Sequence, residues 1–137
     1  MLSEKKSRSQ KLMSPKDYKT AQIYLERIIE HINKIRKYKK GLSLKKFKEQ
    51  DQEYDAICMQ LSQIGENVSK IEISMDKIIE KFPSAVNWKA LKGLRNKIDH
   101  DYTWLETDKI WVMLENDFDD LESGVKNILK KRYGLKK

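Results

Sequence analysis

Apolar residues recur every three or four positions through almost the whole 137-residue chain. This spacing is typical of amphipathic helices, and no segment shows the alternation of apolar and polar residues that marks a half-buried strand. Turn residues are scarce, with five glycines and two prolines. The pattern predicts an all-α, mostly antiparallel bundle of four main helices plus one or two short ones.

The helix boundaries follow from capping residues. Ser14-Pro15 begins the first helix, which ends near Gly41, and Ser43 caps a short helix carrying Phe47. Later helices begin at Asp51, Ser74, Asn87 and Thr107. The helix from Ser74 ends at Phe82 and has Met75 among its apolar residues, and the last helix continues to Leu129. One domain is therefore expected over residues 14–133, with a basic N-terminal tail over 1–13 and a C-terminal tail over 134–137.

A glycine lies inside the predicted helix that begins at Asp51. Gly65 interrupts a regular apolar stripe and is followed by Glu66. A glycine in a helix costs about 1 kcal/mol relative to alanine, so its presence needs a reason. We expect it to permit the close approach of another backbone or of a ligand.

The charge distribution fits two interpretations, a basic surface that binds a polyanion such as a nucleic acid and an ordinary solvated surface. The formal net charge is +8, and residues 34–48 contain eight lysines and arginines without one acidic residue. No apolar run is long enough for a membrane span, and the N-terminus lacks the apolar stretch of a secretory signal. The single cysteine, Cys58, lies among apolar positions and is expected to be a buried thiol in the cytoplasm.

Polar chemistry is concentrated in residues 94–102, which hold one of the two histidines of the chain. On an ideal helix, Asn96 and His100 share a stripe, and Arg95 and Tyr102 share the next. Arg95 and His100 are five residues apart, or about 140° around the axis. They converge on one target only if the helix ends near His100 or if a second chain completes the site.

The residue types exclude several kinds of site. His31, Cys58 and His100 lack metal-ligand spacing, so no metal is expected, and there is no glycine-rich phosphate loop. What remains is metal-free acid and base catalysis by His100, with Arg95 stabilising an anion, as RNA cleavage requires. Two chains related by a two-fold axis would bring two such pairs into one cleft, which makes a homodimer part of this hypothesis.

A purely structural interpretation stays open from spacing alone. Arg95 and Asp99 can form an ordinary ion pair between residues four apart, and Asn96 can hydrogen-bond His100. Tyr102 can be a core aromatic residue with its hydroxyl at the rim.

The motif Arg95-x4-His100-x-Tyr102 resembles the R-x4-H-x-Y signature of HepT-like toxins in the HEPN superfamily. The likeness extends from about Tyr18 to Leu129 and includes several shorter motifs in the same order. These are Tyr38-x-x-Gly41-Leu42-Ser43 with Phe47, Ile64-Gly65-Glu66, Phe82-Pro83 before Trp88, Gly93-Leu94-Arg95-Asn96, and Trp111 through Asn116-Asp117.

The resemblance implies a homodimeric, metal-independent ribonuclease that is the toxin of a toxin–antitoxin module and uses no cofactor. Its partner would be an MntA-like nucleotidyltransferase that transfers adenylyl groups from ATP to Tyr102. By position, Arg95 and His100 are the catalytic pair, while Asn96 and Glu66 support them. The chain departs from the family in having Asp99 and Asp101 beside the histidine, and two carboxylates there would raise the pKa of His100 and weaken the attraction for phosphate.

A competing hypothesis is a non-catalytic helical module that binds a nucleotidyltransferase or a nucleotide. Loss of RNA cleavage on His100→Ala, with fold and dimer preserved, would favour the ribonuclease. The sequence identifies neither the RNA that is cut nor the number of adenylyl groups added.

Overall fold

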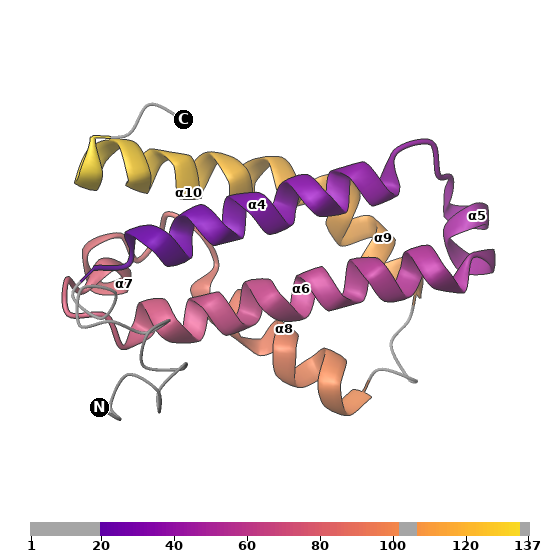
Figure 1. Cartoon of the computed structure of the whole chain (residues 1–137), viewed down its shortest axis with the longest axis horizontal. Helices are drawn as coiled ribbons and strands as arrows, with labels where there is room; N and C mark the ends of the chain where they lie inside the picture. The colour runs from indigo at the N-terminus through magenta and orange to yellow at the C-terminus, as the bar shows by residue number, and fades with distance from the viewer. Residues whose placement is uncertain (1–19, 102–106, 135–137) are drawn as a thin grey trace, which may run out of the picture.

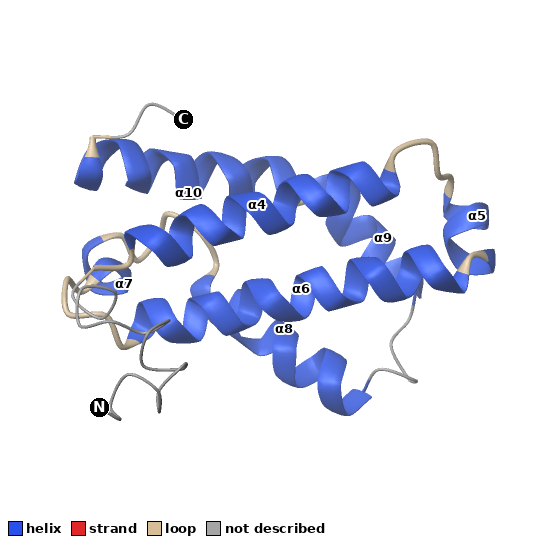
Figure 2. Cartoon of the chain, viewed as in Figure 1, coloured by secondary structure: helices blue, strands red, loops and turns tan. Residues whose placement is uncertain are grey.

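The computed structural model describes residues 20–101 and 107–134, and these residues form seven helices and no strand (Figures 1 and 2). The all-α prediction is therefore confirmed. The helices are α4 (Gln22–Lys39), α5 (Leu44–Glu49), α6 (Asp51–Glu72), α7 (Ile78–Lys81), α8 (Trp88–Asp101), α9 (Thr107–Asn116) and α10 (Phe118–Tyr133).

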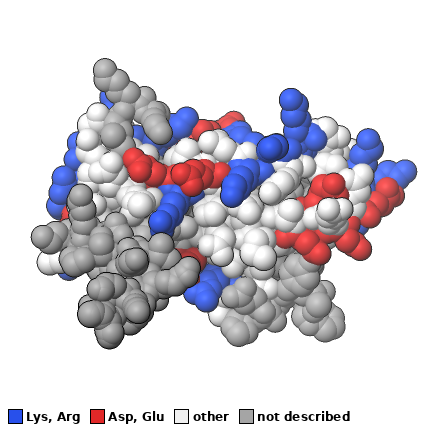
Figure 3. Space-filling model, viewed as in Figure 1, with Lys and Arg blue, Asp and Glu red and all other residues white. Residues whose placement is uncertain are grey.

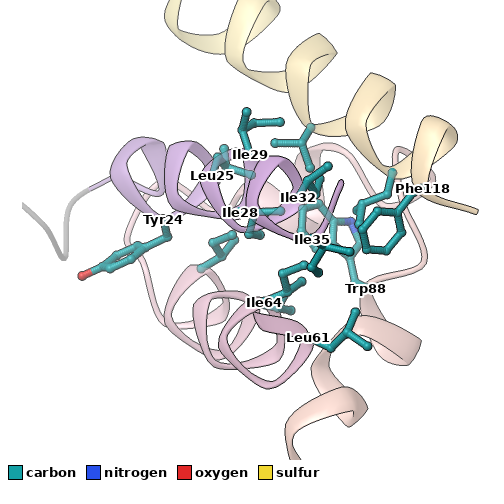
Figure 4. Close-up of a cluster of buried hydrophobic side chains, with 14 of the residues drawn as sticks. Tyr24, Leu25, Ile28, Ile29, Ile32, Ile35, Leu61, Ile64, Trp88 and Phe118 are labelled. Carbon is teal, nitrogen blue, oxygen red and sulfur yellow. The ribbon is translucent and has the colours of Figure 1, made fainter. Parts of the chain in front are cut away.

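The core lies between α4 and α6, which run side by side in opposite directions (Figure 1). Helix α10 packs against α4, and α8 packs against α6. Figure 4 shows Ile28 and Ile32 of α4 directed toward Ile64 of α6, with Phe118 of α10 at the edge of the cluster. The predicted apolar stripes are buried, because α4 and α6 each supply a row of nearly inaccessible aliphatic side chains at helical spacing.

Three of the predicted helix boundaries are confirmed. Gly41 has φ of +80°, a left-handed conformation that ends the first helix at little steric cost. The Ser43 side chain accepts a hydrogen bond from the Lys46 amide at 3.2 Å, and Asn87 Oδ1 accepts one from the Ala90 amide at 3.1 Å. Ser14-Pro15 and the tails over 1–13 and 135–137 lie outside the described residues, but Thr20 and Ala21 are not helical. The prediction of one continuous helix from Ser14 is therefore wrong, because α4 begins at Gln22.

The helix predicted from Ser74 to Phe82 is wrong in its first half, because only Ile78–Lys81 is helical. The Ser74 hydroxyl donates to the Ile71 carbonyl at 2.7 Å, and Lys77 has φ of +55°, which an α-helix does not accept. Met75, one of the apolar residues of this predicted helix, is 67% exposed. The turn is held instead by Asp76, which accepts hydrogen bonds from the Ala21 amide at 3.2 Å and from the Tyr133 hydroxyl.

The last predicted helix is divided into two, because the helix is interrupted at Asp117 between α9 and α10. Asparagine and aspartate are poor helix formers because their side chains compete for backbone hydrogen bonds, and Asn116 and Asp117 lie side by side here. The break turns α9 across the end of the bundle near α5 (Figure 1). Within the described ranges, no helix is both long enough and apolar enough to cross a membrane.

Candidate functional site

Gly65 sets the distance between α6 and α8. A Cβ atom at this position would lie 2.8 Å from the Arg95 amide nitrogen and 3.0 Å from the Leu91 carbonyl oxygen. Both are backbone atoms of α8, so a side chain here would force the two helices apart. The expectation that this glycine permits the close approach of another backbone is confirmed.

The close crossing places Glu66 beside Arg95, although the two residues are 29 positions apart in sequence. Glu66 Oε1 accepts a charge-assisted hydrogen bond from Arg95 Nη1, and the two side chains are 30% and 55% exposed. Glu66 Oε2 also lies 3.9 Å from Lys70 Nζ. The predicted supporting carboxylate therefore contacts the predicted catalytic arginine, on a surface that solvent reaches.

Helix α8 carries the rest of the motif. Asn96 is exposed on α8, and the helix is continuous through position 100 to Asp101, so Arg95 and His100 belong to different stripes of one helix, about 140° apart. The side chains of residues 99–101 and all of Tyr102 lie outside what the structure describes. The structure thus joins Glu66 and Arg95 and leaves the position of the His100 imidazole undescribed.

The basic segment over residues 34–48 is partly neutralised within the chain. Arg36 Nη2 lies 2.9 Å from both Asp119 and Glu122, Lys48 Nζ lies 2.7 Å from Asp108, and Lys39 pairs with Glu115. Figure 3 shows basic and acidic side chains next to each other across this view of the surface. The predicted basic surface is consequently less positive than the run of lysines suggests.

Sequence reasoning missed a groove of about 580 Å³ between α8 and α9. Its floor is apolar and consists of Leu61, Leu94, Ile98, Ile110 and Met113. A second hollow of about 320 Å³ continues it toward α10, since both are lined by Asn87, Ala90, Leu94 and Met113. No pattern in the sequence indicated this groove; in the structure, Leu91 and Leu94 of α8 are only partly buried.

The other two candidate side chains, Cys58 and His31, are in surroundings that do not resemble an active site. Burial raises the pKa of the Cys58 thiol to about 11, and its side chain is 2% exposed, which is unlike an activated nucleophile. His31 Nδ1 lies 2.7 Å from Gln60 Oε1. Over residues 20–98 and 107–134, no three histidine, cysteine, aspartate or glutamate side chains gather as a metal site would require.

Comparison with known proteins finds one matching family model and two similar proteins. The model of the family described as "Ribonuclease HepT-like" matches residues 28–128. "Putative RNase TTE0752" of Caldanaerobacter subterraneus subsp. tengcongensis is 31% identical over 113 residues, covering 82% of this chain and 97% of that protein. "Putative RNase MJ0127" of Methanocaldococcus jannaschii is 26% identical over 114 residues, covering 80% of this chain and 91% of that protein.

No solved structure matches the chain significantly. The family match nevertheless covers most of the helical bundle, from α4 to α10, and it includes both Glu66 and the Arg95 motif. The chain therefore belongs to the HepT-like ribonuclease family.

Proposed function

We propose that this protein is a HepT-like toxin that cleaves RNA without a metal, as a homodimer in which Arg95 and His100 are the catalytic residues. The observation that carries the proposal is the Glu66–Arg95 contact at the Gly65 crossing. It fixes the guanidinium of the family motif on an accessible surface. A guanidinium has five N–H donors, so a bond to a carboxylate is compatible with bonds to a phosphate.

The reaction needs two proton transfers and one stabilised charge. A base takes the proton of the ribose 2′-hydroxyl, the 2′-oxygen attacks phosphorus, and the bond to the 5′-oxygen breaks as an acid protonates it. The products are a 2′,3′-cyclic phosphate and a 5′-hydroxyl. Imidazole titrates near neutrality and suits both transfers, while Arg95 binds the non-bridging oxygens of the phosphorane.

Dimerisation supplies the second imidazole. The C-terminal half of α8, which carries the motif, extends past α6 at the lower edge of Figure 1. Two such ends related by a two-fold axis would form one cleft with two Arg95 and two His100 residues, one imidazole acting as base and the other as acid. This arrangement also removes the problem of the 140° between the two stripes.

Control by an MntA-like nucleotidyltransferase fits the same cleft. Tyr102 follows directly on the last residue of α8, so it is two positions from His100. Transfer of AMP from ATP to its phenol oxygen, with release of pyrophosphate, would add bulk and negative charge where the RNA phosphate binds. Adenylylation would then inhibit cleavage without unfolding the bundle.

The test is RNA cleavage by purified protein whose mass shows no modification, beside His100→Ala, in excess chelator. Cleavage that persists in chelator and is lost in the variant, with dimer and helix content unchanged, supports a metal-free nuclease. Equal rates in both proteins would exclude His100 from the chemistry. If neither protein cuts a broad RNA pool, the non-catalytic binding module becomes the better hypothesis.

A further inference from the structure

The groove between α8 and α9 combines an apolar floor with a basic rim. Lys89 and Lys97 of α8 and Lys109 of α9 line it above the aliphatic floor. Its volume of about 580 Å³ lies within the range of small-molecule sites, and it extends along α8 from Asn87 to Ile98, next to the motif. An apolar floor with cations at its edge suits a ligand that has a flat apolar part and a negative charge.

Gly93 faces this groove, and packing does not explain it. Nothing lies within 4 Å of a Cβ atom built at Gly93, whereas a Cβ atom at Gly65 would meet the α8 backbone; both glycines are helical. An exposed glycine in a helix costs about 1 kcal/mol relative to alanine. Packing does not require this glycine, and the missing side chain leaves the α8 backbone open to a ligand in the groove.

The charge of the rim favours a polyanion over a second copy of the chain. Neither Lys89 nor Lys97 forms an ion pair with any described carboxylate. A symmetric contact through this groove would place the patch against its own copy, lysines facing lysines. Single-stranded RNA instead offers bases for the floor and phosphates for the lysines.

We propose that this groove is a subsite for the nucleotides that flank the scissile phosphate, an inference that rests on the proposed ribonuclease function. One base lies against Leu94, Ile98 and Met113 beside Gly93, and the adjoining phosphates bind Lys89 and Lys97. The groove then guides the strand along α8 toward position 100 of the motif, which is three residues from Lys97 and on the same stripe of the helix. It selects unpaired RNA, because a base within a duplex cannot reach an apolar floor.

The test measures the affinity of a fluorescent 2′-O-methyl hexanucleotide of mixed sequence by anisotropy. Methylation of the 2′-oxygen prevents cleavage, so binding is measured independently of catalysis. Gly93→Leu fills the groove with a good helix former, and the pair Lys89→Ala and Lys97→Ala removes the rim. The control pair is Lys130→Ala and Lys131→Ala, which removes the same charge from exposed positions in the last turn of α10.

We expect at least tenfold weaker binding for the leucine variant and for the rim pair, and less than threefold for the control. The rim pair should also lower the slope of log affinity against log salt concentration by about 1.4, because two phosphate contacts are lost. Equal affinities in all variants would overturn the subsite, even if the wild type cleaves RNA. Conversion of a dimer to a monomer by Gly93→Leu would also overturn it, since the groove would then be an interface.

These results separate the subsite from catalysis. If the wild type cuts no RNA but the groove variants still weaken binding, the nuclease proposal fails and the subsite for single-stranded RNA stands. If the wild type cuts RNA and the groove variants bind normally, the nuclease proposal stands and the subsite proposal fails.

Discussion

Replacing Gly65 with alanine should separate α6 from α8. The new methyl group would lie 2.8 Å from the Arg95 amide nitrogen and 3.0 Å from the Leu91 carbonyl oxygen. Neither atom belongs to a flexible side chain, so relief requires a shift of one whole helix. The shift would also displace Arg95 relative to Glu66.

The magnitude follows from two opposing terms. Overpacking against a rigid neighbour costs about 3 kcal/mol, at the upper end of its usual range. Alanine recovers about 1 kcal/mol of helix propensity. The net loss is about 2 kcal/mol, which for a chain of this length lowers the midpoint of thermal unfolding by roughly 6 °C.

The matched control is Gly93→Ala, which makes the same chemical change in a helix where nothing lies within 4 Å. It should raise the free energy of unfolding by about 1 kcal/mol. Urea and thermal unfolding, followed by circular dichroism, compare both variants with the wild type. The reasoning is refuted if Gly65→Ala stabilises the protein as much as Gly93→Ala does.

Three further predictions concern side chains. Glu66→Gln should change the free energy of unfolding by no more than about 0.5 kcal/mol, because the ion pair with Arg95 is partly exposed. The same variant should slow RNA cleavage about tenfold, because Arg95 is no longer held in position; an unchanged rate would show that the ion pair has no role in positioning. Tyr133→Phe should cost about 1–3 kcal/mol, because buried Asp76 loses a hydrogen-bond donor, and a midpoint of urea unfolding equal to that of the wild type would count against this. Burial raises the pKa of the Cys58 thiol from 9.0 to about 11, so the thiol should add stability below pH 9 that is lost as the pH rises through 11, because the unfolded thiol ionises first. Unfolding midpoints and thiol labelling across this pH range check the prediction. Rapid labelling of the native protein at pH 8 would contradict the burial of the thiol.

The sequence predicted the helices where local signals agree with tertiary packing. The aliphatic stripes of α4 and α6, the Ser43 and Asn87 caps and the left-handed Gly41 are all features of a few neighbouring residues. The first half of the predicted Ser74–Phe82 helix failed because Asp76 is held by Ala21 and Tyr133, which are 55 and 57 residues away. No local pattern carries that information.

The candidate site, too, was predicted from the sequence only in part. The family motif identified Arg95 and the neighbourhood of Glu66, and the structure brings these two side chains together across the Gly65 crossing. The neutralisation of Arg36 by Asp119 and Glu122 joins residues more than 80 positions apart. The groove was not predictable, because a concave surface depends on the angle between α8 and α9 and not on the residues of either helix alone.

The claim that two chains share one active site is tested most directly by mixing wild-type protein with inactive His100→Ala protein and allowing the subunits to exchange. Mixed dimers would lack either the acid or the base. At equal amounts, the cleavage rate should fall to about a quarter of that of an all-wild-type sample at the same total concentration, because only wild-type pairs are active. A rate of about half, in proportion to the wild-type fraction, would show that each chain acts alone and would contradict the shared site.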